Sequence, residues 1–215
     1  MGSGGLRASG ACVPTMLRCE DISPALGFRH LSEIRGIRYE LRYAGSNNFC
    51  GRTLYQNLDC AWLREPAAAG LEQAAQWLNE QHPGYTLLVL DALRPQRVQE
   101  AIWRDVSNTP MSRYFADPVR GSIHSFGMAV DVTLISPDGM ECDMGAGFDE
   151  MTERSHPKLE PQHLSSGLLS ADHLSARHRL YAAMAEGGYR GIDTEWWHFD
   201  HGDREQVRRE MQRVM

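Results

Sequence analysis

The hydrophobic pattern of the chain predicts three amphipathic helices and one charged helix. Over residues 66 to 81 apolar side chains recur every three or four positions, and Pro66 falls in the first turn, where a helix tolerates proline. A second helix is predicted over residues 95 to 106. A third extends over residues 171 to 187, where two successive glycines end it. The charge-rich residues 204 to 213 are typical of a solvated terminal helix.

Strand patterns lie between these helices. Residues 85 to 91 and 130 to 135 are almost continuously apolar, which predicts buried strands. Residues 34 to 43 alternate apolar and charged side chains in their second half, as a half-buried strand does. A final strand region is predicted over residues 189 to 200. This order of elements predicts an α+β fold in which helices pack against a central, mostly antiparallel sheet.

The remaining segments indicate how the domain is organised. A chain of 215 residues fits one domain, which we place at residues 21 to 215. Residues 1 to 20 are rich in glycine and serine and are predicted to be poorly ordered. Residues 143 to 170 are long and weakly periodic for a small domain, and such a segment is more often functional than a simple connection.

Composition narrows the class of protein. The net charge of -6 argues against nucleic acid as the main partner, because phosphate binding favours a basic surface. Five cysteines without Cys-x-x-Cys spacing indicate reduced thiols. No apolar run approaches a membrane span or a secretory core, so we expect a cytoplasmic protein without a membrane partner. The oligomeric state stays open, with a homo-oligomer as one option.

Two residues near the middle of the chain form the first candidate site. His124 and Asp131 lie seven positions apart with Gly127 between them, and Asp131 stands between two valines in a buried strand. Taken alone, His124 is more readily explained as an ordinary core or surface histidine, and Asp131 as a strand-end aspartate. A carboxylate buried among valines is costly, however, unless it is paired or binds a metal. A turn at Gly127 would let both side chains face one centre.

The segment from Glu195 to His198 supplies further groups of the same kind. With His198 as a third ligand, two imidazoles and a carboxylate match a catalytic zinc site, which favours nitrogen and oxygen ligands and keeps one position open. Glu195 could then serve as general base and acid. Because three positions separate them, an extended chain would place Glu195 and His198 on opposite faces, so the chain must bend near Glu195.

Arg94 follows the buried strand in the segment Asp91-Ala-Leu-Arg-Pro95. Two interpretations are open. Arg94 pairs with Asp91, or its guanidinium stabilises the negative oxygen of a transition state. A donor of the second kind contributes about 3 kcal/mol to lowering a barrier.

Several motifs together resemble a known family. Ser-x-His-x-x-Gly-x-Ala-x-Asp at 122 to 131 and Glu-x-Trp-His at 195 to 198 resemble the zinc D-alanyl-D-alanine peptidases, which share a fold with the hedgehog signalling domain. Further pieces are similar to the D-Ala-D-Ala dipeptidases of the vancomycin-resistance type. They lie at residues 38 to 44, 48 to 51, 91 to 96 and 143 to 156.

The resemblance implies a role for each matching residue. It makes the protein a dipeptidase with one zinc ion, bound by His124, Asp131 and His198. Glu195 would be the general base and acid, and Arg94 would stabilise the transition state. The substrate is implied to be a small D,D-dipeptide, whose ammonium and pocket contacts would involve Asp149, Ser122, Tyr43 and Tyr55. Ser122 is expected near the substrate carboxylate.

Two departures and two alternatives remain. Phe126 stands where relatives usually have arginine, and residues 111 to 121 are shorter than in some relatives. A D,D-carboxypeptidase acting on cell-wall peptides is one alternative. That activity requires room beyond the N-terminal side of the substrate, where Asp149 would instead require a free ammonium. A zinc-bearing binding module without catalysis is the other. The sequence does not separate vancomycin resistance from wall recycling or use of D-Ala as a nutrient.

Overall fold

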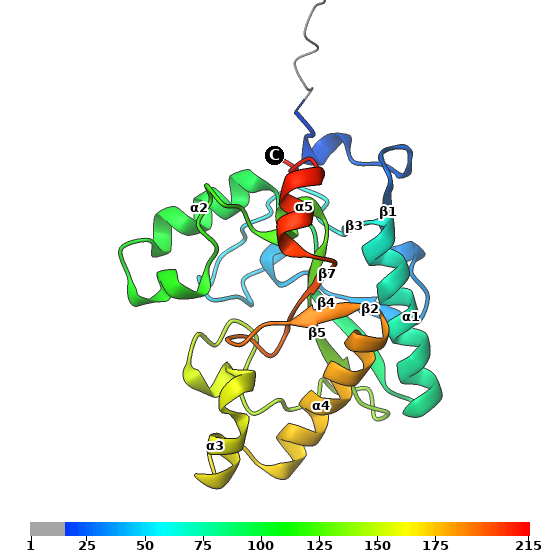
Figure 1. Ribbon diagram of the computed structural model, residues 1–215, viewed down its shortest axis with the longest axis vertical. Helices are drawn as coiled ribbons and strands as arrows, with labels where there is room; N and C mark the ends of the chain where they lie inside the picture. Colours follow the sequence, from blue (N-terminus) through cyan, green and yellow to red (C-terminus); the bar gives the residue numbers. More distant parts are fainter. Residues whose placement is uncertain (1–15) are drawn as a thin grey trace, which may run out of the picture.

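The computed structural model describes residues 16 to 215, and its centre is a five-stranded sheet (Figure 1). β2 pairs in parallel with β4, whereas the β4–β5, β5–β7 and β7–β6 pairs are antiparallel. The sheet of the predicted α+β fold is therefore mostly antiparallel, as expected. In sheet order its strands are β2 (Ile37–Tyr39), β4 (Thr86–Asp91), β5 (Ala129–Ile135), β7 (His198–His201) and β6 (Tyr189–Gly191).

Helices cover this sheet as the hydrophobic pattern predicts. The long helices are α1 (Glu65–Gln81), α2 (Gln96–Val106) and α4 (Ala171–Glu186), each within one residue of its predicted start. α1 and α4 pack closely, because a Cβ added to Gly70 of α1 would lie 2.4 Å from the carbonyl oxygen of Gly187. Two shorter helices are α3 (Glu160–Ser165) and α5 (Arg204–Glu210).

Alternation along β5 separates the core from the functional face. Val130, Val132 and Leu134 join the hydrophobic core shared with α1 and α4. Asp131 and Thr133 are buried on the other face, because successive strand residues point in opposite directions. The sheet thus presents its polar side chains away from the α1 and α4 layer.

Three features differ from the sequence prediction. The final strand region is two strands, β6 and β7, joined by residues 192 to 197, because the chain turns before His198. A small two-stranded sheet of β1 (Phe28–His30) and β3 (Trp62–Arg64) had no predicted counterpart. The segment 143 to 170 contains α3.

No helix in the described residues is long and apolar enough to cross a bilayer.

The predicted N-terminal segment, residues 1 to 20, lies mostly outside the described residues, as does Cys12. Within the described part, Cys19–Asp21 forms a short 3-10 helix and Leu17 bridges to Val214 near the C-terminus. The four described cysteines, Cys19, Cys50, Cys60 and Cys142, are free thiols.

Candidate active site

A tight turn brings His124 over the central sheet. Ile123–Phe126 forms a 3-10 helix that ends at Gly127, whose φ of 69° lies in the left-handed region that favours glycine. A Cβ at this glycine would also lie only 2.9 Å from Cε1 of Phe28. The turn that the motif predicted is therefore present, and both the backbone conformation and the space favour glycine.

Strand register aligns the carboxylates and the second histidine. Asp131 of β5 pairs with Asp91 of β4 on one side and with His198 of β7 on the other. Directly opposed residues of antiparallel strands point to the same face with their Cβ atoms about 4.5–5.5 Å apart. The sheet therefore places these three side chains in one row, and the Gly127 turn adds His124 above it.

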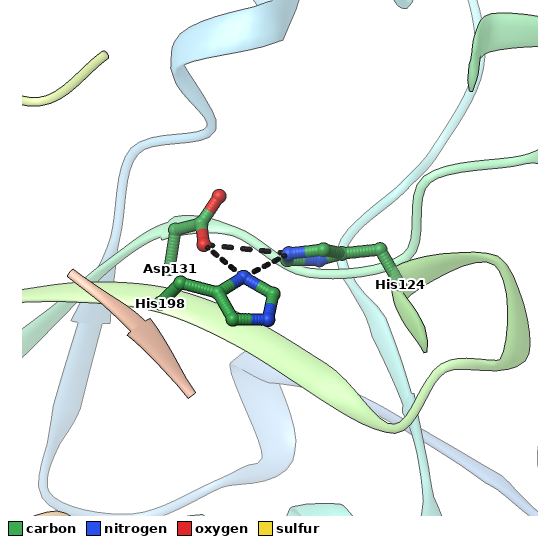
Figure 2. A group of neighbouring side chains, drawn as sticks. All are labelled: His124, Asp131 and His198. Atoms are coloured by element: carbon green, nitrogen blue, oxygen red, sulfur yellow. Dashed lines mark hydrogen bonds and ion pairs between the residues drawn. The ribbon is translucent and has the colours of Figure 1, made fainter. Parts of the chain in front are cut away.

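The three predicted metal ligands converge on one point (Figure 2). Oδ1 of Asp131 lies 3.3 Å from Nε2 of His124 and 3.0 Å from Nδ1 of His198. The two ring nitrogens are 3.1 Å apart. Ligand atoms at about 2.0–2.2 Å from a tetrahedral zinc lie about 3.3–3.5 Å from one another, so the observed triangle is only slightly tighter than zinc requires.

The outer nitrogens of both imidazoles are already engaged. His124 donates from Nδ1 to the carbonyl oxygen of Ala92 at 2.7 Å, and His198 donates from Nε2 to Oδ1 of Asp200 at 2.9 Å. In neutral imidazoles this leaves Nε2 of His124 and Nδ1 of His198 as lone-pair atoms directed at Asp131. Three acceptors facing one another repel unless a cation lies between them.

The pKa shifts of the group also indicate that a cation would be stable there. Burial lowers the pKa of His198, but the neighbouring Asp200 and Asp131 outweigh burial and raise this pKa to about 10. Burial likewise raises the pKa of Asp131, yet His124 and His198 hold it below the usual range. The site therefore favours a positive charge at the position where the three ligand atoms meet.

Glu195 lies beside this group, as the required bend predicts. The chain turns at Trp196 and Trp197, so Glu195 lines the same cavity as His198 although three positions separate them. The side chain is buried, and burial raises the pKa of its carboxyl to about 7. A carboxyl that titrates near neutral pH suits a group that accepts and returns a proton.

Arg94 makes the ion pair with Asp91 that the first of the two interpretations expects. Its Nε and Nη2 donate to Oδ2 of Asp91 at 2.9 and 2.7 Å, and Nη2 also donates to Oδ2 of Asp131 at 3.3 Å. Nη1 donates to Gln99 at 3.3 Å, and the guanidinium lies 4.8 Å from the Tyr43 ring centre. Four of the five guanidinium N–H groups are used, so one Nη1 N–H remains for another acceptor in the cavity.

Asp149 provides a buried carboxylate elsewhere in the cavity. Its Oδ1 accepts from the Tyr43 hydroxyl at 3.3 Å and its Oδ2 accepts from the Phe49 amide at 3.2 Å. Burial, and then the charge of Asp131, raise the pKa of Asp149 well above its usual range. The residue has a φ of 60°, a sparsely populated conformation that aspartate tolerates better than most residues. A cationic ligand would relieve the cost of ionising this carboxyl.

One cavity of about 350 Å³ joins these groups. Eight of the nine predicted site residues line it: Tyr43, Arg94, Ser122, His124, Asp131, Asp149, Glu195 and His198. Tyr55 is set apart. It is fully buried against Tyr43, and its hydroxyl donates to Asp91, so its position supports other site residues rather than touching the cavity.

Comparison with known proteins places the chain in a family. The model of the peptidase M15 family, described as D-ala-D-ala dipeptidase, matches residues 25–214. The chain belongs to this family. A D-alanyl-D-alanine dipeptidase of Escherichia coli (strain K12) is 38% identical over 167 residues, which cover 76% of this chain and 78% of that protein. One of Enterococcus faecium is 32% identical over 196 residues, covering 81% and 91%.

The protein is thus a metallopeptidase, and its buried group of His124, Asp131 and His198 could hold the metal. A solved structure of the LdcB LD-carboxypeptidase is more distant, with 15% identity and a TM-score of 0.47. That match covers 84% of this chain and 70% of the other.

Two residues of this peptidase site were not singled out for a role at the metal ligands. Asp200 holds the outer nitrogen of His198, and Asp91 holds Arg94 and the Tyr55 hydroxyl. A signal for Asp200 was available, because a carboxylate two positions after a strand histidine lies on the same face of the strand. For Asp91 the signal was its position as a charged residue at the end of a buried strand. The sequence analysis accounted for that position by the pairing with Arg94 alone.

Proposed function

We propose that zinc is the metal of this dipeptidase and that His124, Asp131 and His198 bind it. The observation that carries the proposal is the convergence of three acceptor atoms, one carboxylate oxygen and two imidazole nitrogens. Hydrogen bonds to Ala92 and Asp200 fix the orientation of the two imidazoles. Nitrogen and oxygen ligands without sulfur, and only three of them, are typical of a catalytic zinc site. When bound, zinc would polarise the substrate carbonyl and lower the pKa of water to about 7.

In this proposal Glu195 moves the proton. Its carboxyl, with a pKa near 7 in the metal-free site, would accept the proton of the attacking water and then donate it to the leaving amine. The free Nη1 N–H of Arg94 would donate to the carbonyl oxygen as negative charge develops there. The ion pair with Asp91 keeps the guanidinium in place, which lowers the cost of reorganisation during the reaction.

Substrate binding is assigned to the residues around the remaining cavity wall. Asp149 would accept hydrogen bonds from the ammonium of D-Ala-D-Ala. The Tyr43 hydroxyl and the Phe49 amide orient the two carboxylate oxygens of Asp149. Ser122, next to the metal ligand His124, would lie near the substrate carboxylate. Burying both ends of a zwitterion is favourable only when each charge meets a partner, which explains selection for a short, unmodified dipeptide.

Metal analysis combined with hydrolysis of D-Ala-D-Ala tests this function. We expect one zinc per chain, and in Glu195→Gln a loss of kcat of about 10²- to 10⁴-fold with zinc content unchanged. An N-acetylated D-Ala-D-Ala should be a poor substrate because it lacks the ammonium for Asp149. Equal rates on both substrates would favour a carboxypeptidase. No turnover by the zinc-loaded protein would favour a binding module.

We also infer a cytoplasmic location. The free thiols of Cys19, Cys50, Cys60 and Cys142 support it, because reducing compartments keep cysteines in this state. Fractionation of cells that produce the protein, followed by immunodetection in the cytoplasmic and envelope fractions, tests the location.

A further inference from the structure

The cavity extends past the metal ligands to a group of arginines that the roles above do not use. Arg120, Arg204 and Arg208 line the cavity wall together with Ser122. Arg204 and Arg208 are four positions apart on α5, which places them on one face of that helix. Arg120 comes from the loop just before Ser122, so two separate segments bring the three guanidinium groups together.

Internal contacts hold these arginines in position. Arg208 donates to the carbonyl oxygen of Gly121 at 3.2 Å and to Glu205 at 2.8 Å. Arg120 donates to the same Glu205 oxygen at 2.8 Å, and Arg204 pairs with Asp200. Burial, followed by repulsion from Arg120, lowers the pKa of Arg208, with Arg204 adding to the effect. The three positive charges therefore lie close enough to affect one another.

The donors at this end of the cavity outnumber its free acceptors. Arg120 uses only Nη2 and Arg204 only Nε in these contacts, so most of their N–H groups remain available. The nearby carboxylates are already engaged: Glu205 by two arginines and Asp200 by His198 and Arg204. Asp117 also lines the cavity, and its Oδ1 accepts from the Val119 amide. The wall therefore suits an anionic ligand that accepts several N–H bonds.

This arginine wall lies away from the acidic end of the site. Asp149 comes from the loop between β5 and α3, coloured yellow-green in Figure 1, whereas Arg204 and Arg208 come from α5, in red on the other side of β7. An extended dipeptide spans about 7 Å at 3.3–3.6 Å per residue, with its ammonium and carboxylate at opposite ends. With the ammonium at Asp149 and the scissile carbonyl at the metal ligands, the carboxylate would point toward α5.

We propose that Arg120, Arg204 and Arg208 form a subsite that binds the C-terminal carboxylate of the dipeptide. The inference rests on the proposed function, because it takes the direction of the substrate from Asp149 and the metal ligands. Guanidinium groups bind carboxylates through paired, charge-assisted hydrogen bonds, which gives recognition of the free acid over its uncharged analogues. The enzyme thereby selects both charged ends of its substrate.

The test compares D-Ala-D-Ala with D-Ala-D-Ala amide in wild type, Arg120→Gln, Arg204→Gln and the double variant. Arg209→Gln is the matched control, since Arg209 belongs to the same helix, is exposed and does not line the cavity. Each single variant should raise KM for the free acid about fivefold and leave kcat and the amide kinetics unchanged. Zinc content, measured in every variant, should stay the same. Arg209→Gln should match wild type.

Several results would overturn the subsite. One is an unchanged KM in the double variant, and another is an equal rise in KM for acid and amide. D-Ala-D-Glu is a third substrate: an effect confined to it would assign the arginines to a side-chain carboxylate instead. If wild type hydrolyses no substrate, the proposed function fails. Calorimetric binding of D-Ala-D-Ala then decides the subsite separately, and equal Kd values in wild type and the double variant would refute it.

Discussion

Replacing Glu195 by glutamine should stabilise the metal-free protein while removing its activity. Burial raises the pKa of the Glu195 carboxyl from an ordinary 4.5 to about 7. At about 1.36 kcal/mol per pH unit, this difference of roughly 2.5 pH units corresponds to about 3 kcal/mol of lost stability once the carboxyl is ionised. Glutamine keeps the shape of the side chain but never ionises, so the variant avoids this cost.

The difference in stability between wild type and Glu195→Gln should depend on pH. Between pH 4.5 and 7 the folded protein holds the Glu195 proton and the unfolded chain has released it, so wild-type stability falls as pH rises. Below pH 4.5 the two proteins should be similarly stable. Above pH 7 the Glu195→Gln variant should be more stable by about 3 kcal/mol. Asp149 is present in both proteins, and because the charge of Glu195 contributes to its raised pKa, the substitution also eases ionisation of Asp149, which adds to the gain of the variant.

Urea unfolding of chelator-treated protein at pH 4 to 8, followed by tryptophan fluorescence, measures this difference. Glu33→Gln serves as a control, because Glu33 is exposed and its substitution should change stability by less than about 0.5 kcal/mol at every pH. A Glu195→Gln variant no more stable than wild type at pH 8 would refute the reasoning. So would a stability gain that does not depend on pH.

Three further predictions follow from single contacts. Gly127→Ala should lower the free energy of unfolding by about 1–3 kcal/mol in thermal denaturation, because of its left-handed φ and the 2.9 Å approach of Phe28. Asp200→Asn should weaken zinc binding about 10- to 100-fold in a competition assay with a chromophoric chelator, since Asp200 orients His198. Asp149→Asn should raise KM for D-Ala-D-Ala at least tenfold with unchanged zinc content, through loss of a charged hydrogen bond.

Each of these predictions has a result that contradicts it. Unchanged stability of Gly127→Ala would mean that the turn accommodates a side chain. If zinc affinity were the same in Asp200→Asn, the orientation of His198 would depend on β7 alone. An Asp149→Asn variant with normal KM for D-Ala-D-Ala would place the ammonium elsewhere in the cavity.

The periodic parts of the fold were predictable from sequence because their signal is local. α1, α2 and α4 follow apolar side chains at helical spacing, and β4 and β5 follow apolar runs. The β1–β3 pair was not predicted, because each strand has only three residues and depends on pairing with a distant segment. The last strand region was predicted without the turn that divides it into β6 and β7, since the residues of that turn include no glycine or proline.

The metal ligands could be predicted for a different reason, which is the cost of burying charge. Asp131 in a strand of valines required a partner, and the sequence offered His124 and His198 as candidates. What the sequence could not supply was the register that sets Asp131 opposite both Asp91 and His198. Asp200 was therefore missed as a support of the site, and Asp91 was anticipated only as a partner of Arg94. Their roles depend on which strands lie side by side.

Phe126, in the motif that carries His124, is contacted by a segment far away in the sequence. Its side chain is buried rather than charged, and the guanidinium of Arg213 lies 5.5 Å from its ring centre. The C-terminal strand-like residues continue the contact, because the Val214 amide donates to the Ser125 carbonyl oxygen at 2.8 Å. A cation from a distant segment thus lies over a side chain of the motif that carries His124. The geometry of His124 therefore depends on the C-terminal segment as well as on Gly127.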